Sequence, residues 1–201
     1  MSTRVEMFVD YVCPYCFLVE GAVEELKRDR DVEVVIRPFE LRPDPVPTLR
    51  PEDEYLPRVW KGSVYPMARR LGVQITLPTI SPQPRTKKAF LVLQLAKERG
   101  VAEEYSRAML AAFFQDNRDI GQDEVIIHAA TSVGLKPDEV DAALASKERR
   151  ARHAEDLRYA VDEVGVQAVP SFLIEGQLIA GVTDAATLKA AVDERSSRAR
   201  S

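Results

Sequence analysis

The chain has 201 residues, of which 45% are hydrophobic and 30% are charged, and its formal net charge is −4. This composition indicates an ordinary globular protein, large enough for one core or for a small domain that carries an insertion. It argues against nucleic-acid binding, because no stripe of lysine and arginine with interleaved aromatics occurs, and against a membrane span, because no apolar run approaches about 20 residues.

The first part of the chain predicts a β-α-β unit. Residues 4–12 are typical of a short buried strand, residues 14–30 have apolar positions near helical spacing, and residues 31–39 form a β-branched run that ends near a proline. Strands joined by a helix in this way should be parallel, with a right-handed crossover. The N-terminus leads into this unit without a signal-peptide pattern, so we expect a cytoplasmic protein.

The only two cysteines, Cys13 and Cys16, stand where the first strand hands over to the helix. C-x-x-C spacing at this position is typical of thiol–disulfide chemistry. The free N–H groups of a helix N-terminus favour a thiolate at Cys13, and Pro14 suits the first helical turn because it has no N–H. We therefore assign Cys13 as the attacking thiol and the more deeply placed Cys16 as the resolving thiol.

Other uses of the cysteine pair are less well supported. A zinc site needs about four ligands, and the two histidines, His128 and His153, lie far along the chain, so we expect no metal. A structural disulfide across so short a loop would stabilise little, because the unfolded chain loses little entropy when the loop closes. Two buried, inert cysteines remain an open alternative.

The middle of the chain predicts a helical insertion. Residues 41–51 contain four prolines, which marks a loop or a boundary. From about residue 52 to 150 apolar residues recur at helical spacing, and the charged stretch 146–164 should be the helix that returns to the first unit. The aromatic residues here are mostly core by their spacing, whereas we expect His128 and His153 on helix surfaces without a chemical role.

The last part predicts a β-β-α unit. Residues 166–174 are strand-like, a tight turn follows at 175–177, and 178–181 completes a hairpin. Thr183 and Asp184 then cap a closing helix. Together these patterns predict an α/β protein with a thioredoxin fold (β-α-β plus β-β-α) that carries a helical insertion domain. We expect a thioredoxin-like domain at 1–45 and 150–196, the insertion domain at 51–149 and a flexible tail at 197–201.

The chain resembles the DsbA-like branch of the thioredoxin superfamily, in particular its FrnE-type members, and it is similar to 2-hydroxychromene-2-carboxylate isomerases and kappa-class glutathione transferases. The resemblance covers nearly the whole chain and rests on four motifs: Asp10-Tyr11-Val12-Cys13-Pro14-Tyr15-Cys16, Pro38-Phe39-Glu40-Leu41, Gly165-Val166-Gln167-Ala168-Val169-Pro170-Ser171-Phe172 and Gly181-Val182-Thr183-Asp184.

The resemblance implies a substrate groove around the cysteines. It implies a cis peptide bond before Pro170, which lies against the C-x-x-C motif and lets the backbone of Val169 bind an extended peptide or glutathione. It also implies contacts with substrate from Pro14 and Tyr15. Thr183 and Asp184 would hold the γ-glutamyl end of glutathione, as the matching pair does in the related transferases and isomerases.

Two departures from the resembled pattern affect the expected chemistry. Thioredoxin and DsbA carry a buried acid six residues before the first cysteine, where this chain has Met7, and strand alternation places Glu6 and Asp10 on the other face. Proton transfer from Cys16 must then use water or another group. The dipeptide Pro14-Tyr15 lacks the histidine of DsbA, so we predict a reduction potential near about −200 to −230 mV rather than about −120 mV.

Three hypotheses about function follow. The leading one is a dithiol–disulfide oxidoreductase that acts on disulfide-bearing proteins or low-molecular-weight thiols, without a tightly bound cofactor and with glutathione as a candidate co-substrate. The second is a glutathione-dependent isomerase or transferase; those enzymes commonly have serine at the first motif position, and the presence of Cys13 argues against them. The third is a redox-inactive fold used for protein binding. The sequence leaves open whether the protein is a monomer or a homodimer.

Overall fold

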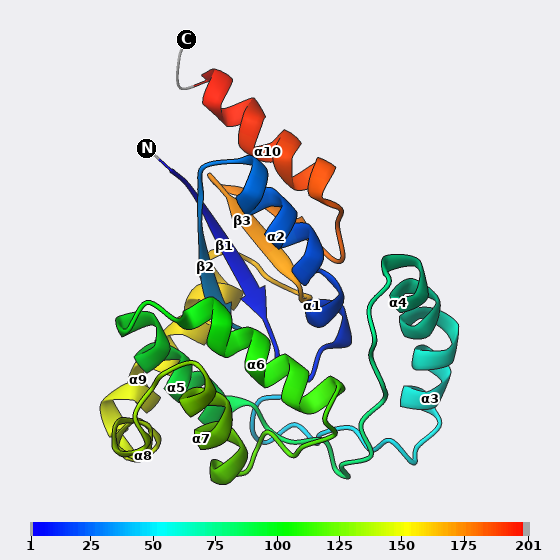
Figure 1. Cartoon of the computed structure of the whole chain (residues 1–201), viewed down its shortest axis with the longest axis vertical. Helices are drawn as coiled ribbons and strands as arrows, with labels where there is room; N and C mark the ends of the chain where they lie inside the picture. Colours follow the sequence, from blue (N-terminus) through cyan, green and yellow to red (C-terminus); the bar gives the residue numbers. More distant parts are fainter. Residues whose placement is uncertain (1, 199–201) are drawn as a thin grey trace.

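A computed structural model describes residues 2–198 and contains a single four-stranded sheet surrounded by helices (Figure 1). The strands are β1 (Thr3–Val9), β2 (Val32–Pro38), β3 (Ser171–Ile174) and β4 (Gln177–Ala180). The helices are α1 (Pro14–Leu18), α2 (Glu20–Asp29), α3 (Tyr55–Val59), α4 (Tyr65–Leu71), α5 (Lys87–Glu98), α6 (Ala102–Phe114), α7 (Asp123–Ser132), α8 (Pro137–Ala145), α9 (Lys147–Arg158) and α10 (Ala185–Arg198). Two π-helical turns, η1 (Trp60–Val64) and η2 (Tyr159–Glu163), follow α3 and α9.

The sheet confirms the predicted thioredoxin fold. Its strand order is β2-β1-β3-β4. The strands β1 and β2 are parallel, with Val5 opposite Val34, whereas β1 and β3 are antiparallel, with Met7 opposite Phe172. The central strand β1 is buried from Val5 to Val9, because it has a neighbour on each side and helices above and below.

The β3–β4 hairpin turns at Glu175 and Gly176, which both have positive φ angles (49° and 88°). Positive φ at both central positions is the geometry of the two-residue turn that suits twisted strands, and glycine adopts it freely. The predicted strand at 166–174 is shorter in the structure and begins only at Ser171. Pro170 has no N–H to give to the ladder, so pairing starts after it.

Helices α2 and α10 lie side by side over the sheet (Figure 1). Lys189 of α10 joins them through ion pairs to Glu25 (2.6 Å) and Asp29 (2.5 Å) of α2. The predicted single helix at 14–30 is interrupted at Val19, between α1 and α2. At the other end of the chain α10 continues to Arg198, so it includes the first two residues of the predicted tail at 197–201; the remainder of that tail, 199–201, lies outside the described residues.

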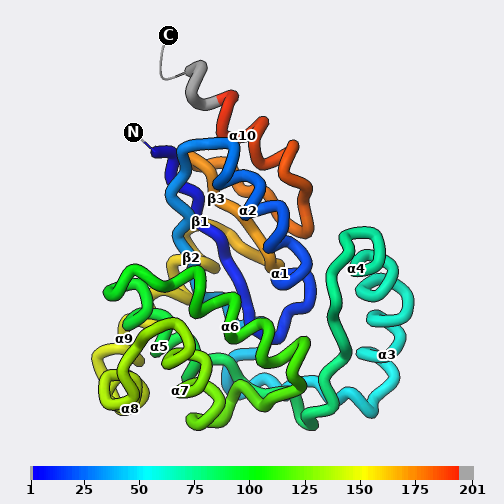
Figure 2. Tube along the Cα trace, in the orientation of Figure 1, coloured from blue at the N-terminus to red at the C-terminus, as the bar shows by residue number. Residues whose placement is uncertain are grey.

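The inserted helices form two groups that the chain trace in Figure 2 separates clearly. Helix α3, the π-helical turn η1 and helix α4 follow one another without a break and form one helical segment at one side (Tyr55–Leu71, hereafter the α3–α4 segment), and α5 to α9 form a bundle. The segment 73–86 between the groups is not helical, although it lies within the predicted helical insertion. Pro78, Pro82 and Pro84 oppose a helix here, because proline removes the backbone donors that a helix needs.

Buried aromatic residues hold the two groups to the sheet layer. Trp60, 1% exposed, packs against Phe114 of α6 with ring centroids 5.8 Å apart, and Phe114 stacks on Phe17 of α1 at 6.1 Å. The expectation that most aromatic residues of the insertion are core is confirmed, with Tyr55 as an exposed exception. The α3–α4 segment is therefore anchored beside the part of the chain that carries the cysteines.

Candidate active site

The cysteine motif lies at the turn between β1 and α1, as the sequence predicts. The backbone N–H of Cys13 donates to the carbonyl of Asp10 (3.0 Å), which closes the turn. Cys13 is the N-cap of α1 in an extended conformation, and Pro14 is the first helical residue. The N–H of Cys16 then donates to the Cys13 carbonyl (3.1 Å), so both cysteines sit on the first turn of the helix.

The two thiols are free and differ in their environments. Cys13 is 4% exposed and Cys16 is fully buried. Burial raises the pKa of Cys16 well above its ordinary value, and the hydrogen bond between the two thiols and the nearby charge of Cys13 raise it further. A thiol with a raised pKa is a poor first nucleophile, which favours Cys13 as the attacking group and Cys16 as the resolving one.

The proline loop lies against the cysteines. The bond between Val169 and Pro170 is cis, and the Cys13 thiol donates to the Val169 carbonyl with a Sγ–O distance of 3.3 Å. The loop is held in place because the Pro170 carbonyl accepts from the N–H of Gly181 (2.8 Å) and the Ser171 hydroxyl donates to the Ala168 carbonyl (2.6 Å). Four predicted site residues, Cys13, Cys16, Val169 and Pro170, are thus brought together.

Tyr15, the second residue between the cysteines, is half-buried. Its hydroxyl lies 2.7 Å from the Ser63 hydroxyl in the π-helical turn η1. The contact joins the cysteine motif to the α3–α4 segment across 48 residues of sequence. Ser63 escaped the sequence analysis because no local pattern marks a partner so far along the chain.

We expect loss of the Tyr15–Ser63 hydrogen bond to expose Cys13. Such a bond stabilises the arrangement in which Tyr15 contacts Ser63 by about 1 kcal/mol. Its loss should therefore raise the population in which the two residues are apart roughly fivefold. Ser63→Ala and Tyr15→Phe should each raise the alkylation rate of Cys13 by a bulky maleimide by about that factor, measured with Cys16→Ser in the background. Ser132→Ala removes a serine hydroxyl on α7 that bonds to the Ala129 carbonyl, and it serves as the control. Unchanged alkylation in both test variants would contradict the expectation.

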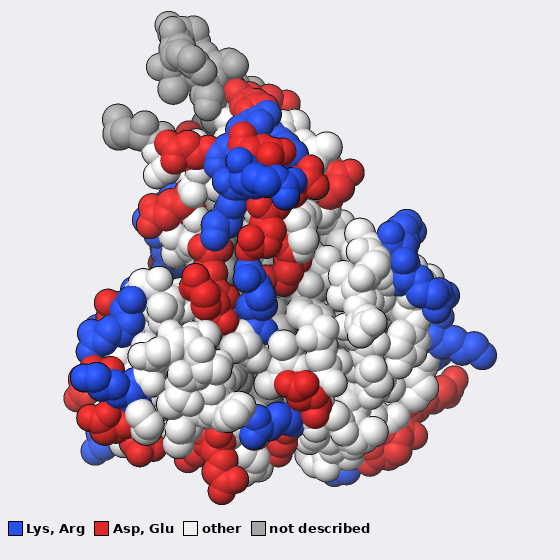
Figure 3. Space-filling view, in the orientation of Figure 1, with Lys and Arg blue, Asp and Glu red and all other residues white. Residues whose placement is uncertain are grey.

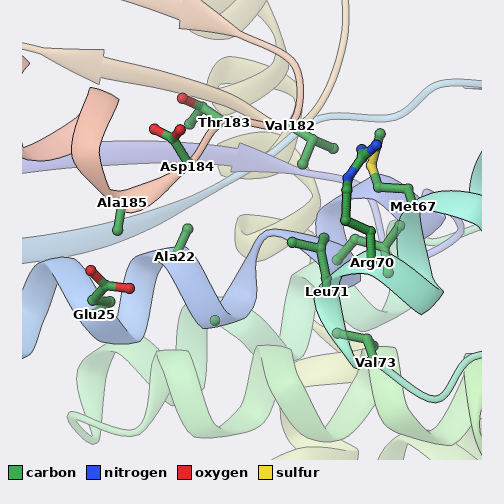
Figure 4. Close-up of a pocket in the computed structure, with 12 residues that line it drawn as sticks. Ala22, Glu25, Met67, Arg70, Leu71, Val73, Val182, Thr183, Asp184 and Ala185 are labelled. Atoms are coloured by element: carbon green, nitrogen blue, oxygen red, sulfur yellow. The ribbon is translucent and has the colours of Figure 1, made fainter.

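Thr183 and Asp184 lie in the loop before α10 and line a pocket of about 470 Å³ between α2 and α4 (Figure 4). Asp184 accepts a hydrogen bond from the N–H of Thr187 (2.8 Å), and this bond lowers the pKa of the Asp184 carboxyl. Its predicted capping role is therefore confirmed. Figure 4 shows Met67, Arg70 and Leu71 of α4 on the side of the pocket opposite the loop.

The pocket is an amphipathic groove next to the motif, and the two cysteines are not among its lining residues. Leu18, Ala22 and Val182 give it an apolar wall, with the Arg70 guanidinium and the Asp184 carboxylate at its edges. Figure 3 shows Lys and Arg side chains along the outer edge of the α3–α4 segment near α4, Asp and Glu side chains below them, and a largely uncharged face between this segment and α6. The groove therefore suits a small ligand that carries a positive group, a negative group and an apolar part between them.

Three buried polar residues beside the motif were assigned wrongly or missed by the sequence analysis. His153 is 1% exposed, not a surface residue, and its Nε2 lies 2.5 Å from Oε1 of Glu40. Asp10 is 1% exposed, with Oδ2 accepting from the N–H of Leu41 (2.7 Å). The alternation argument failed for Asp10 because β1 ends at Val9, so Asp10 belongs to the turn and not to the strand.

The remaining acid of β1 is engaged elsewhere. Glu6 forms an ion pair with Arg37 of β2 (2.7 Å), and both side chains are largely shielded from solvent. The prediction that Glu6 takes no part at the cysteines agrees with this pairing. The residue at the position of the usual buried acid, Met7, is fully buried in the apolar core.

A thioredoxin fold in which two C-x-x-C thiols face a cis-proline loop is the arrangement of the thioredoxin-like class of proteins. A family model of the DSBA-like thioredoxin domain matches residues 4–193, and the chain belongs to that family. None of the helices within residues 2–198 combines the length and apolar character that crossing a bilayer requires.

One curated protein and two solved structures are similar to this chain over nearly its whole length. The uncharacterized protein YwbO of Bacillus subtilis (strain 168) is 36% identical over 195 residues, which covers 96% of this chain and 98% of that protein. A 2-hydroxychromene-2-carboxylate isomerase has a similar structure, with a TM-score of 0.79 at 13% identity and 98% of each chain covered. The cytosolic disulfide reductase DsbM from Pseudomonas aeruginosa with GSH has a TM-score of 0.69 at 15% identity, covering 95% of this chain and 94% of that one.

Proposed function

We propose that the protein exchanges disulfides through its Cys13-Pro14-Tyr15-Cys16 motif. The observation that carries the proposal is the contact between the Cys13 thiol and the carbonyl of Val169 in the cis-proline loop, with Cys16 buried directly behind. A substrate strand placed along this loop would bring its disulfide to Cys13. The same position is where an extended peptide or glutathione would pair with the backbone of Val169.

The reaction has two steps. The Cys13 thiolate attacks one sulfur of the substrate disulfide, a Cys13–substrate bond forms, and the other substrate sulfur leaves as a thiolate. Cys16 then loses its proton and attacks Cys13, which releases the second substrate thiolate and leaves a Cys13–Cys16 disulfide. The substrate gains two electrons and the cysteine pair loses two, so the reverse reaction oxidises a dithiol substrate.

Glutathione is the small-molecule partner that we propose for the groove. Its γ-glutamyl end carries an ammonium and a carboxylate, for which Asp184 and Arg70 offer the complementary charges, with Thr183 beside them. DsbM, which shares the fold, is named as a cytosolic disulfide reductase and was determined with GSH. A reducing role in the cytoplasm, with glutathione or a disulfide-bearing protein as the exchange partner, is the setting that we propose.

Equilibration with mixtures of reduced and oxidised glutathione tests the proposal. We expect the Cys13–Cys16 pair to equilibrate with a potential near about −200 to −230 mV, because no cation stands between the cysteines to stabilise the Cys13 thiolate as in DsbA. Mass spectrometry of the acid-quenched protein should show glutathione attached to Cys13 as a transient species. A potential near about −120 mV would contradict the argument from the Pro14-Tyr15 dipeptide.

The second candidate is a glutathione-dependent isomerase or transferase. The pocket at Thr183 and Asp184 and the structural similarity to 2-hydroxychromene-2-carboxylate isomerase favour it. In that case glutathione would bind tightly without a covalent bond, its own sulfur would do the chemistry, and Cys13→Ser would keep full activity. Calorimetric titration of the reduced protein with glutathione separates the candidates, since the oxidoreductase needs only weak, exchanging binding.

A further inference from the structure

A second groove lies apart from the pocket at Thr183 and Asp184. The two connections that flank the α3–α4 segment, 41–54 and 73–86, run side by side at the end of the molecule farthest from α10 (Figure 1), and the N–H of Gln83 donates to the Leu49 carbonyl (2.7 Å). Together with α5 and the first turn of α9 they enclose a groove of about 670 Å³. Its apolar wall includes Ile80, Pro82 and Leu91.

Basic side chains outnumber acidic ones in this groove, hereafter the basic groove. Its basic residues are Arg85, Lys87, Lys88 and Arg150, and its acidic residues are Asp44 and Asp119. Arg85 is paired with Asp44 (2.8 Å), and Lys88 is paired with Asp123 (2.8 Å), which does not line the groove. The chain as a whole has a net charge of −4, so a local excess of positive charge runs against its overall balance.

Two of the basic side chains are available to an outside anion. Within residues 2–198 the Lys87 ammonium has no hydrogen bond or ion pair, and the Arg150 guanidinium donates only to the carbonyls of Leu144 and Ala145 at the end of α8. Both side chains are exposed. Because Lys87 begins α5 and Arg150 belongs to α9, the available charges come from two separate elements of the groove wall.

The start of α5 adds to the positive potential of the basic groove. Its first turn contains no acidic residue, and no side chain caps its free N–H groups. Gln83 lines the same groove and is only 6% exposed, and across the part of the chain that the structure describes its side-chain amide makes no hydrogen bond. The amide therefore has two N–H donors free for a carboxylate in the groove.

The basic groove continues toward the cysteine motif. A small hollow of about 10 Å³ is lined by Val12, the neighbour of Cys13, and by the half-buried Arg42. Asp10 borders the same hollow, but its side chain is only 1% exposed. The hollow and the basic groove share four lining residues, Thr48, Gln83, Pro84 and Arg85. A chain that leaves Cys13 in this direction therefore reaches the basic groove.

We propose that the basic groove docks an acidic segment of the disulfide-bearing protein whose cysteine reacts with Cys13. The inference rests on the proposed function and names the class of protein on which it acts. Carboxylates of the segment would pair with Lys87 and Arg150 and accept from the Gln83 amide. Complementary charge beside the reacting thiol raises the rate of productive encounter more than it raises final affinity, so the expected signature is kinetic.

Peptide disulfides that differ only in the charge of their arms test the proposal. Each peptide has one cysteine with three Glu-Gly or three Gln-Gly pairs on either side, because six extended residues reach about 20 Å. The disulfide-linked dimers are mixed with the reduced protein, and mass spectrometry of acid-quenched samples follows adduct formation on Cys13. The reaction of each dimer with dithiothreitol, a neutral thiol, gives the intrinsic reactivity by which the rates are divided.

The acidic dimer should react about tenfold faster than the neutral one at low salt, and the preference should fade as the salt concentration rises. The net charge of −4 alone predicts the opposite order. Lys87→Gln and Arg150→Gln should each lower the ratio of the two rates by roughly two- to threefold, as expected for exposed charges. Lys136→Gln removes an exposed lysine that does not line the groove, and it should leave the ratio unchanged.

The same measurements keep the two levels of inference apart. Equal normalised rates for the two dimers, or one common ratio in all three variants and the wild-type protein, would overturn the docking role and leave disulfide exchange intact. Millimolar inorganic phosphate at constant ionic strength should not change the ratio; if it abolishes the preference, the groove is a site for a free anion and the proposal fails. Absence of any adduct with either dimer would contradict the proposed function itself.

Discussion

A Cys13→Ser variant should reduce insulin disulfides no faster than the uncatalysed reaction, whereas Cys16→Ser should complete the first attack and stop at the mixed disulfide. The difference arises from burial. Cys13 lies at the start of α1 against the proline loop, where a substrate disulfide can approach, and Cys16 is fully buried behind it. Serine is a far weaker nucleophile than a thiolate at neutral pH, so the first variant has no attacking group.

The two variants are best compared side by side in two assays. Turbidity in the presence of dithiothreitol reports insulin reduction, and mass spectrometry of the pre-reduced variants mixed with insulin without dithiothreitol reports trapped complexes. We expect covalent insulin adducts with Cys16→Ser and none with Cys13→Ser. Thermal unfolding of both variants checks that the fold is intact. Adducts that form in Cys13→Ser through Cys16 would show that the roles of the two cysteines are reversed.

The parts of the site that lie close together in sequence were predictable. A strand, a turn and a helix start put Cys13, Pro14 and Cys16 in their places, and the hairpin followed from the turn at Glu175 and Gly176. These outcomes depend on local rules, namely strand length, proline at a helix start and positive φ at glycine. The proline loop opposite the cysteines came from resemblance, since no local rule brings residue 170 to residue 13.

The contacts that the sequence did not reveal join distant segments. Ser63 of the α3–α4 segment contacts Tyr15, and Glu40 contacts His153 across 113 residues. His153 stands on a helix that is charged almost throughout, so its sequence context favours a surface position. Asp10 was misplaced for a different reason, because strand alternation was applied one residue past the end of β1. An aspartate three residues before the first cysteine of a C-x-x-C motif is a sequence signal for a buried acid at this turn, and similar sequences could be checked for it.

The Glu40–His153 contact carries the largest effect on stability that we expect outside the apolar core. Both side chains are buried, and His153 also stacks on Phe90 with ring centroids 5.7 Å apart. Glu40 follows β2 and His153 belongs to α9, so the pair ties the edge of the sheet to the helical bundle. Removing one partner leaves the other polar group buried without compensation, which costs about 3–5 kcal/mol.

Glu40→Leu and His153→Phe should therefore each lower the melting temperature by roughly 10 °C. The double variant should be less destabilised than the sum of the two, because it replaces the pair with apolar groups and leaves no charge unpaired. Lys88→Ala breaks a solvent-exposed ion pair with Asp123 and should change stability by no more than about 0.5 kcal/mol. Urea unfolding of the wild-type protein, the two single variants and the double variant gives the coupling energy between Glu40 and His153 directly. A coupling energy near zero, with each single variant losing less than about 1 kcal/mol of unfolding free energy, would contradict this prediction. It would show that the buried aromatic residues around Phe90, and not the Glu40–His153 contact, hold the bundle to the sheet.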